Sequence, residues 1–371
     1  MNTQWISPND MPGETDSERI QNAIDQAAAT GTGQVIIPRH NKATGQDLWS
    51  IDRTLRLPSK IEILIDGAHL QQADNTFCQM FATENYFDPA HPAQEDIILR
   101  GQNGAVLDGG NYNGLSEATC KQPGMPHIRC NTMLLFYHVS GLVVSDLKIM
   151  RQRWWGITNL FVSNARFGNL LFQADLSRID ENGVHHPDEA PRTYQETYVK
   201  NADGIDLRLG CHHITIENIR GFTEDDTVAL TALSGFETEY LVPGQETDIH
   251  HITVQNVEAD CYYTSLLRLL CSKEHRIHHI TAKHLKDTRT TPAYQATATV
   301  RLGDVDYTDR YADADNIYEI AVDQVTSKAL YAVSVCNGVT DASFTNLKAA
   351  GEAFHVFQHA RLMNVEISLA E

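Results

Sequence analysis

The feature that most limits the fold of this chain is a short strand-like sequence that occurs three times. It reads His-His-Ile-Thr and begins at His212, His250 and His278, so the copies lie 38 and 28 residues apart. Weaker copies begin at Ile317 and Val339, with a last one near Arg361. Apolar and polar residues alternate in each copy, as in a half-buried strand. Repeats of roughly 20–50 residues are typical of solenoids, in which each coil packs on its neighbours, so the pattern predicts a β-solenoid.

The intervals between the copies are unequal, which indicates coils that carry loops of different lengths. Such loops are polar and rich in turn residues. We expect them at Ser177–Tyr198, Ser234–Thr247, Asp287–Tyr294 and Asp304–Ala314. No segment has the composition of an interdomain linker, so we predict a single domain over residues 1–371.

The N-terminal region predicts one helix followed by strands. Asp16 or Ser17 can cap the helix, and Ile20, Ile24 and Ala27 follow at helical spacing up to the glycines after Thr30. Short strands are then predicted at Gln34–Pro38, Ile61–Ile65, Ile97–Leu99, Val106–Gly110 and Gly141–Leu147. The helix would therefore cap the first coil of the solenoid.

Composition excludes several classes of partner. The formal net charge is −19, from 48 acidic and 29 basic residues, which disfavours nucleic acid and anionic membrane surfaces. No stretch approaches the apolar length of a transmembrane helix. The first residues lack the basic and apolar segments of a signal peptide, so we expect a cytoplasmic protein, with a trimmed secreted protein as the alternative. Seven scattered cysteines without a CxxC pair indicate reduced thiols; the alternative is a Cys120–Cys130 disulfide.

Two acidic motifs lie one coil apart. The first is Asn201-Ala202-Asp203-Gly204, and the second is Glu224-Asp225-Asp226, with 22 residues between Asp203 and Asp225. Residues one coil apart stack about 4.8 Å from each other. Crowded carboxyls acquire different pKa values, which supplies the acid and base that glycoside hydrolysis needs. The alternative is that these acids only form turns. Asp225 and Asp226 can share a cleft only if the chain bends there; Asp206 and Glu224 are expected to be solvated neighbours.

Several segments resemble a known superfamily. The segment Asp16–Ile24, the strand before Pro38, the Leu55–Ser59 segment and the Asp108-Gly109-Gly110 turn resemble the opening of pectin-lyase-like right-handed β-helices. Within it, the two acidic motifs resemble the Asn-Thr-Asp-Gly and Asp-Asp motifs of glycoside hydrolase family 28, the polygalacturonases. The resemblance implies an all-β fold: a single-stranded right-handed parallel β-helix with a short N-terminal capping helix.

The resemblance also implies a mechanism. Asp225 would be the general acid that protonates the leaving oxygen, and Asp203 and Asp226 would hold and deprotonate the attacking water. The family inverts configuration and uses no metal or other cofactor. Two of its motifs differ here: the Gly-His-Gly motif falls near Tyr262–Leu266 without a histidine, and the Arg-Ile-Lys motif, at Arg301-Leu302-Gly303, lacks its lysine. We therefore expect an exo-acting hydrolase of a small pectin-like or related oligosaccharide.

Further residues are predicted to bind the substrate. A platform for a sugar ring and its carboxylate could be formed by Arg151, Arg153, Trp154 and Trp155, of which Arg153 and Trp155 are predicted to bind the substrate. The alternative is that one tryptophan packs in the core and one arginine lies on the surface. Arg268 and Arg301 lie in apolar strands and should face outward, into solvent or a cleft. The remaining predicted substrate-binding residues are Tyr262 and Tyr263. The His-His pairs differ in spacing from tetrahedral zinc sites, so a stacked ladder without metal is predicted for them.

Two other functions stay open at this point. One is a β-helix polysaccharide lyase or epimerase, which would need a base and a charge neutraliser such as Ca²⁺ or an arginine. The other is a non-catalytic glycan-binding β-helix, such as a tailspike-like module. Three acids that converge in a cleft would favour hydrolysis, and scattered acids would favour binding. The sugar, its linkage and the oligomeric state are left undetermined by the sequence.

Overall fold

The computed structural model describes residues 5–110, 123–124, 132–152, 154–175, 178–179, 185–186, 202–235, 239–290, 298–304 and 312–370. Arg153, Cys120 and Cys130 lie outside this set. The chain folds as two compact units: Met1–Tyr86, His91–Thr158 and Asn169–Ala202 form the first, and Phe87–Ala90, Asn159–Gly168 and Asp203–Glu371 form the second. The prediction of a single domain over residues 1–371 stays a prediction.

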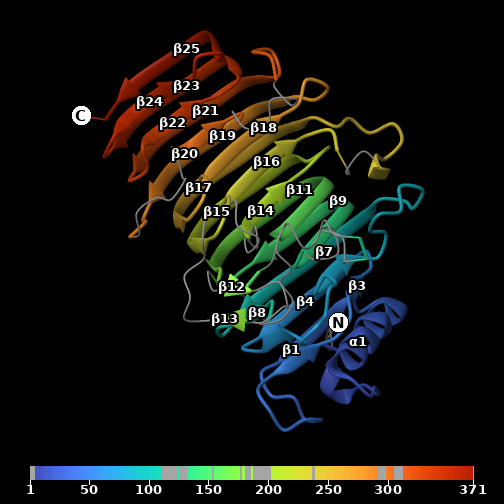
Figure 1. Cartoon of the computed structure of the whole chain (residues 1–371). Coiled ribbons are helices and arrows are strands. Elements are labelled where there is room, and N and C mark those ends of the chain that lie inside the picture. Colours follow the sequence, from blue (N-terminus) through green and yellow to red (C-terminus); the bar gives the residue numbers. More distant parts are fainter. Residues whose placement is uncertain are drawn as a thin grey trace. The chain divides into compact units, whose positions relative to one another are not determined.

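The first unit is built from three ladders of parallel strands (Figure 1). One ladder runs through β1 (Gln34–Pro38), β4 (Ile61–Asp66), β7 (Gln94–Gln102) and β9 (Leu134–Ser145). The second runs through β2 (Trp49–Ile51), β5 (His69–Gln72), β8 (Val106–Asp108) and β10 (Lys148–Met150) to β11 (Trp155–Gln173). The third joins β3 (Leu55–Leu57) and β6 (Phe81–Thr83) to β9.

The core of this unit is a column of stacked apolar side chains. Val35, Ile63, Leu99 and Val144 pair in register from coil to coil, and all four are fully buried. A parallel ladder places the same face of every strand toward the same side. The alternation in the sequence therefore becomes one continuous core, and the strands predicted from it are confirmed.

The predicted helix is α1 (Asp16–Thr30), preceded by a 3₁₀ turn, η1 (Pro8–Asp10). Its cap is Thr15, whose hydroxyl accepts a hydrogen bond from the Glu18 amide at 3.3 Å, so the prediction of Asp16 or Ser17 as the cap was wrong. The Asp16 carboxylate instead accepts bonds from the first coil, including one of 2.8 Å from the Ser50 amide. Ser17 accepts a bond from the Asp52 amide at 2.9 Å. Both residues therefore tie the helix to the coil that it covers.

The second unit has two parallel ladders. We call the first the short-strand ladder; it consists of β14 (Asp203–Leu207), β16 (Val228–Ala232), β18 (Leu267–Cys271), β20 (Ala298–Leu302), β22 (Tyr331–Val335) and β24 (Glu352–Val356). We call the other the long-strand ladder; it consists of β15 (His212–Thr223), β17 (Ile249–Cys261), β19 (Ile277–Asp287), β21 (Ile317–Ser327), β23 (Gly338–Ala349) and β25 (Arg361–Leu369). Two short strands, β12 (Arg178–Ile179) and β13 (His185–His186), pair antiparallel.

The sequence repeats form successive rungs of the long-strand ladder. Ile214 pairs with Ile252 and Ile252 pairs with Ile280, and each is only 1% exposed. The weaker copies pair onward as β21, β23 and β25. The predicted right-handed parallel β-helix with an N-terminal capping helix is therefore confirmed.

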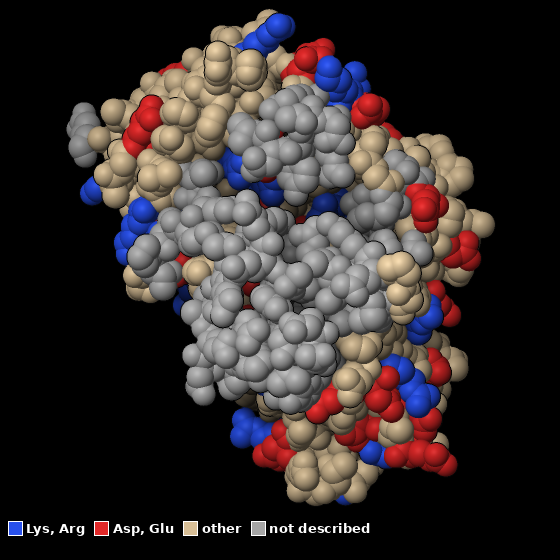
Figure 2. Space-filling view, viewed as in Figure 1, with Lys and Arg blue, Asp and Glu red and all other residues tan. Residues whose placement is uncertain are grey.

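The surface carries no single acidic patch on the face drawn in Figure 2, where the acidic and basic side chains of the described residues are interleaved. Within the described residues, α1 is too short and too polar to span a membrane, and no other helix is long enough. Of the predicted insertions, the described part of Ser234–Thr247 connects β16 to β17. The other three lie largely outside the described residues.

Candidate active site

The three predicted catalytic carboxyls come from neighbouring coils of the short-strand ladder. Asp203 begins β14, and Asp225 and Asp226 lie in the turn before β16. The Gly204 amide donates to the Asp226 carbonyl oxygen at 2.9 Å, which places Asp203 beside Asp226. All three side chains are buried. The structure therefore brings the two acidic motifs together at the start of adjacent rungs.

The turn between β15 and β16 lets two consecutive carboxyls point the same way. The Thr264 hydroxyl lies 2.6 Å from Asp225 Oδ1 and 2.6 Å from Asp226 Oδ1. In a regular strand, consecutive side chains would point to opposite faces. The bend expected from the sequence is thus present, and Thr264, from the next coil, joins the two acids.

This bridge requires the two carboxyls to differ in protonation. A hydroxyl has one hydrogen to donate, so Thr264 cannot donate to both Asp225 and Asp226 at once. Two short contacts are satisfied together if one carboxyl is protonated and donates to Thr264 while Thr264 donates to the other. The charges around the pair decide which carboxyl keeps the proton.

Asp226 is surrounded by groups that hold its anion. Arg268 Nη1 donates to Asp226 Oδ2 at 3.2 Å, and the Ser265 amide donates to Oδ1 at 3.2 Å. Donors that bond to a carboxylate favour its charged form. Burial raises the pKa of Asp225 to about 7, and the neighbouring Asp226 charge adds to this, against the opposing Thr264 bond. Asp225 is therefore the carboxyl that holds a proton below about pH 7, and the Arg268 guanidinium faces Asp226.

Asp203 belongs to the same electrostatic cluster. Burial raises its pKa well above the ordinary value, followed by repulsion from Asp206, Asp225 and Asp226. Asp206 is fully buried, and Arg208 Nη2 donates to its Oδ1 at 2.9 Å. Burial raises the pKa of Asp206 to about 7, although the Arg208 charge opposes the shift.

The expectation that Asp206 and Glu224 are solvated was wrong. Asp206 is 0% exposed and Glu224 is 1% exposed. Asp206 lies within β14, which pairs with β16 on the next coil, and all five residues of each strand are buried. These two side chains therefore enlarge the buried acidic cluster instead of lining a wet surface.

Arg268 and Arg301 stack on neighbouring strands, β18 and β20. Both bind the carboxylate of Asp304: Arg301 Nη2 lies 3.1 Å from Oδ1, and Arg268 Nη2 contacts Oδ2. The Asp304 amide in turn donates to Asn337 Oδ1 at 3.0 Å. The arginines are only 8% and 7% exposed, so they do not face open solvent; the alternative, that they face a cleft, stays a prediction. Their charges are compensated by carboxylates, which makes burial tolerable.

The other predicted substrate-binding residues are distributed differently. Trp155 is buried at the start of β11, in the part of that strand that belongs to the first unit. Tyr263 is 1% exposed and packs edge-on against Tyr262, with ring centroids 4.8 Å apart. A ring as buried as that of Tyr263 cannot stack on a sugar without moving. Arg153 lies outside the described residues.

Four polar residues of the cluster were missed by sequence reasoning: Thr264, Ser265, Asp304 and Asn337. Thr264 and Ser265 lie 39 residues after Asp225 and Asp226, the same offset by which Val228 pairs with Leu267. The first two lie in the segment Tyr262–Leu266, which the sequence places one coil after the Asp-Asp motif, but only its tyrosines were predicted to belong to the site. Asp304 and Asn337 occupy turns after β20 and β22, and no repeat marks them.

The metal-like clusters among the described residues are histidine clusters, not the acidic site. His213, His250 and His251 form one, and His278, His279 and Glu319 form the other. The rings of His212, His250 and His278 stack at 4.9 and 5.1 Å, as do those of His213, His251 and His279 at 4.6 and 4.5 Å. The predicted stacked ladder is therefore confirmed.

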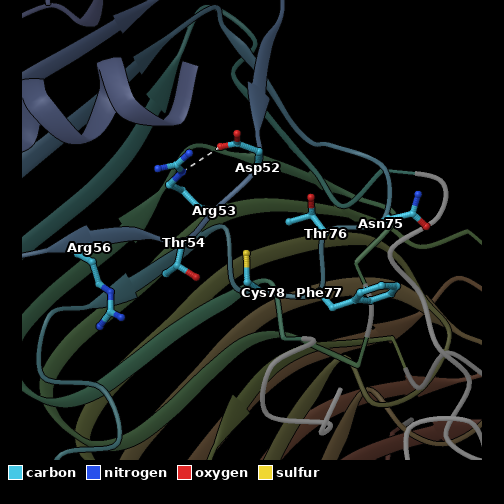
Figure 3. A pocket seen from close by; sticks show the side chains of 8 residues that line it. All are labelled: Asp52, Arg53, Thr54, Arg56, Asn75, Thr76, Phe77 and Cys78. Atoms are coloured by element: carbon cyan, nitrogen blue, oxygen red, sulfur yellow. Dashed lines mark hydrogen bonds and ion pairs between the residues drawn. The ribbon is translucent and has the colours of Figure 1, made fainter. Parts of the chain in front are cut away.

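A separate cavity lies in the first unit (Figure 3). It has a volume of about 470 Å³ and contains none of the predicted site residues. Two arginines there are already engaged, one with Asp52 and Glu18 and the other with the Tyr86 hydroxyl. The lining residues are Asp52, Arg53, Thr54, Arg56, Asn75, Thr76, Phe77 and Cys78.

Solved structures with the same coil arrangement include carbohydrate-active proteins. An exopolygalacturonase from Thermotoga maritima is 14% identical over 98% of this chain and 92% of its own, with a TM-score of 0.63. An endo-xylogalacturonan hydrolase from Aspergillus tubingensis is 13% identical over 98% and 92%, with a TM-score of 0.52. This chain has the pectin-lyase-like β-helix fold.

A tailspike protein of E. coli bacteriophage HK620, solved with a pentasaccharide, is also similar in structure. It is 13% identical over 97% of this chain and 65% of its own, with a TM-score of 0.66. No family model matches the sequence, and no curated protein does. At these identities the shared property is the fold.

Proposed function

We propose that this protein is a glycoside hydrolase that cleaves an O-glycosidic bond in a pectin-like or related oligosaccharide. The observation that carries the proposal is the buried Asp203–Asp225–Asp226 cluster, in which the pKa of Asp225 is raised to about 7 and Arg268 donates to Asp226. Glycoside hydrolysis needs one carboxylic acid and one carboxylate on either side of the scissile bond. The fold shared with two pectin-type hydrolases supports the same reading.

In the proposed reaction Asp225 donates its proton to the leaving oxygen as the bond to the anomeric carbon breaks. Asp226, kept anionic by Arg268, removes a proton from the attacking water, and Asp203 helps to hold that water. Thr264 joins the acid to the base. After one turnover Asp226 carries the proton that it took from the water. Transfer of this proton to Asp225 restores the starting state.

We further propose inversion of the anomeric configuration. Inverting enzymes keep their two carboxyls roughly 6.5–9.5 Å apart, and retaining enzymes keep them about 5–5.5 Å apart. Two hydrogen bonds of 2.6 Å to Thr264 hold the nearest oxygens of Asp225 and Asp226 closer together than the inverting range. For inversion the water would therefore have to lie between Asp226 and Asp203, on the side of Asp226 away from Asp225, and product stereochemistry tests this point directly.

We propose an exo-acting enzyme that accepts at most one acidic sugar beside the cleaved bond. Arg268 and Arg301 share Asp304, and Arg268 also pairs with Asp226, so two guanidinium charges face two carboxylates. Arg301 Nε is buried and has no hydrogen-bond partner among the described residues. Insertions flank both acidic motifs in the sequence, which would favour a closed pocket over an open groove. The cytoplasmic location stays a prediction.

The test is a panel of neutral and acidic oligosaccharides, with products followed by NMR. We expect release of one terminal sugar with inverted configuration, loss of turnover in Asp225→Asn, and wild-type turnover in Asp315→Asn, an exposed aspartate of the second unit. A retained product would overturn the inverting assignment, and a rapid fall in the viscosity of a long polymer would overturn exo action.

The two alternatives give different results in the same panel. An unsaturated product would show a lyase. Tight binding without cleavage of any oligosaccharide would show a glycan-binding protein, a function for which the likeness to the tailspike solved with pentasaccharide is the specific support. Either outcome would overturn the hydrolase proposal.

A further inference from the structure

The histidine ladder differs from an ordinary stack of surface side chains because each rung carries two rings in edge-on contact, with interplanar angles of 83°, 80° and 69°. Consecutive residues of a strand normally point to opposite faces. Here the second residue of each pair is left-handed: φ is 55° at His213, 53° at His251 and 53° at His279. This conformation is uncommon for residues other than glycine. It brings Nδ1 of both rings together at 2.8, 2.7 and 2.7 Å on the three rungs.

Contacts of this length require a lone pair on one nitrogen of each pair. Two protonated Nδ1 atoms would place two N–H groups against each other, so one ring must donate and the other must accept. One ring of each pair therefore presents a lone pair on Nδ1, and a nitrogen lone pair is what a metal ion binds.

The proton positions on the central rung are fixed by a carboxylate. Glu246 Oε1 lies 2.7 Å from His250 Nε2, and a carboxylate can only accept, so His250 donates from Nε2. The lone pair of a neutral His250 is then on Nδ1, directed at His251 Nδ1. Metal-binding histidines are typically oriented in this way, with the far nitrogen donating to a carboxylate.

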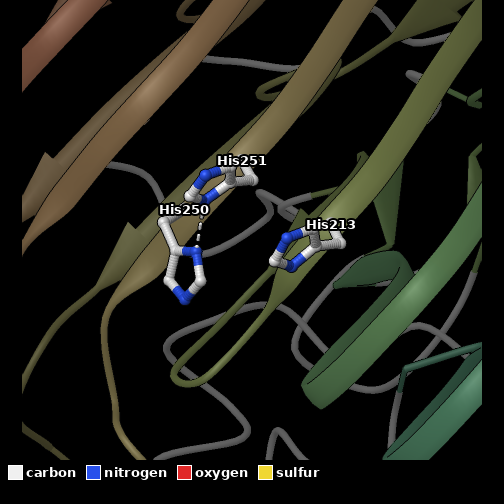
Figure 4. Close-up of side chains that lie close together, drawn as sticks. All are labelled: His213, His250 and His251. Carbon is white, nitrogen blue, oxygen red and sulfur yellow. Dashed lines mark hydrogen bonds between the residues drawn. The ribbon is translucent and has the colours of Figure 1, made fainter.

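A metal ion could replace the proton that the Nδ1 atoms of His250 and His251 share. Zinc binds histidine nitrogens at about 2.0–2.1 Å in tetrahedral sites, so two ligand nitrogens lie about 3.3 Å apart. The two Nδ1 atoms, now 2.7 Å apart, would have to separate by about 0.6 Å. Figure 4 shows the His213 ring beside that of His251, and the ligand atoms of all three residues lie within 4.8 Å of one another. His213 is exposed, so its ring can turn to supply a third nitrogen.

We propose that His250, His251 and His213 form a binding site for a late first-row divalent ion, of the class that includes Zn²⁺, Ni²⁺ and Cu²⁺. Imidazole is a preferred ligand of these ions, whereas Mg²⁺ and Ca²⁺ prefer oxygen. His213 belongs to β15, and His250 and His251 belong to β17. A bound ion would therefore link two successive coils and stabilise the solenoid. This site is independent of the proposed hydrolase chemistry.

The test is calorimetric titration of the full chain, without a polyhistidine tag, with Zn²⁺ alone. We expect saturable binding of one ion, no binding of Mg²⁺, and a rise in melting temperature with Zn²⁺. His251→Asn should weaken binding by about tenfold or more, since even second-shell changes cost 10–100-fold. Asparagine is chosen because it tolerates the left-handed conformation. His359→Asn, an exposed histidine between β24 and β25, is the matched control and should bind like wild type.

A second readout uses the wild-type protein and does not depend on the folding of a variant. Zn²⁺ should protect His250 and His251 from acylation by diethyl pyrocarbonate, measured by mass spectrometry, and should leave His359 reactive. Absence of saturable Zn²⁺ binding would overturn the proposal. So would equal affinity of wild type and a folded His251→Asn protein, or equal protection of all three histidines.

Discussion

The acidic cluster and the histidine ladder lie on the two ladders of the same unit and use coil stacking in opposite ways. In the histidine ladder the same residue type returns on every rung, and the rings stack in register. In the acidic cluster the stacked positions differ: Ala229, Arg268, Arg301 and Ser334 succeed one another in register. Burial also differs, since the acids are covered while His251 and His279 are exposed.

The comparison teaches where chemistry arises in a repetitive fold. Identical stacked residues make every rung alike, which favours regular packing. Different stacked residues allow a carboxylate, a hydroxyl and a guanidinium to meet within hydrogen-bonding distance, as Asp226, Thr264 and Arg268 do. Departures from the repeat therefore mark the site better than the repeat itself.

The largest expected effect is on turnover. Asp225→Asn removes the proton that the leaving oxygen needs, so kcat should fall by about 10²–10⁴-fold while the fold is kept. Asp315→Asn should leave kcat unchanged. The measurement is steady-state kinetics on the substrate found in the panel. Retention of more than about a tenth of kcat by Asp225→Asn would show that another group is the acid.

Two arginines, one buried and one exposed, test how burial changes the contribution of an ion pair to the free energy of unfolding. Arg268→Met leaves Asp226 without its buried partner and Asp304 with Arg301 alone, so the free energy of unfolding should fall by about 3–5 kcal/mol. Arg276→Met removes an exposed contact, 4.0 Å from Asp248, and should cost about 1 kcal/mol or less. Urea denaturation measures both. Similar losses for the two variants would contradict the buried network.

The Thr264 bridge can be removed without a large change in shape. Thr264→Val leaves Asp225 and Asp226 without their common partner, and a hydrogen bond to a charged group contributes about 1.5–3 kcal/mol. We expect lower kcat and a shifted pH profile, with little change in KM. Thr253→Val, on β17, is the control. A pH profile identical to wild type would argue that Thr264 only packs.

The smallest effect, and the one that contrasts the two regions most directly, is the dependence of stability on pH. The pKa of Asp225 is raised to about 7, so its stabilising contribution is present below the unfolded value and is lost as pH rises through 7. The pKa of His278 is lowered, so its contribution is present above the ordinary value of 6.5 and is lost as pH falls below it.

Urea denaturation at about pH 5 and about pH 8 measures these opposite trends. Asp225→Asn should be closest to, or above, wild type in stability at the higher pH, where the wild-type carboxyl is charged. His278→Asn should be closest to wild type at the lower pH, where the wild-type imidazole becomes charged. A constant difference from wild type at both pH values would contradict the assigned burial of either group.

The sequence predicts the pairing of the strands better than the structure of the turns between them. The near-identical His-His-Ile-Thr copies fix the pairing of Ile214 with Ile252 and Ile280, because apolar alternation allows one register. The two acidic motifs likewise predict that Asp203 and Asp226 meet. The environment of the meeting point was not predictable, since it depends on turns.

Turn residues contribute the groups that decide the chemistry. Thr264 and Ser265 reach Asp226, and Asp304 reaches Arg268, from bends between strands, where no periodicity constrains the side chain. The contact between the two histidine rings of each rung was also not predictable, because a His-His pair in a sequence does not indicate a left-handed backbone at its second residue. The burial of Asp206 and Arg268 was missed for a related reason. The alternation of apolar and polar residues predicts toward which face of a strand a side chain points, but not which other residues cover that face.

The unequal coil lengths along the long-strand ladder have an evolutionary consequence. His212 pairs with His250 across 38 residues and His250 with His278 across 28, yet both pairs stack with nearly the same ring separation. Lengthening a loop costs little, about 0.6 kcal/mol for each doubling. Insertions and deletions between rungs can therefore accumulate in a lineage without disturbing the rungs themselves. A descendant could acquire a new recognition loop in one genetic step and still inherit an intact scaffold.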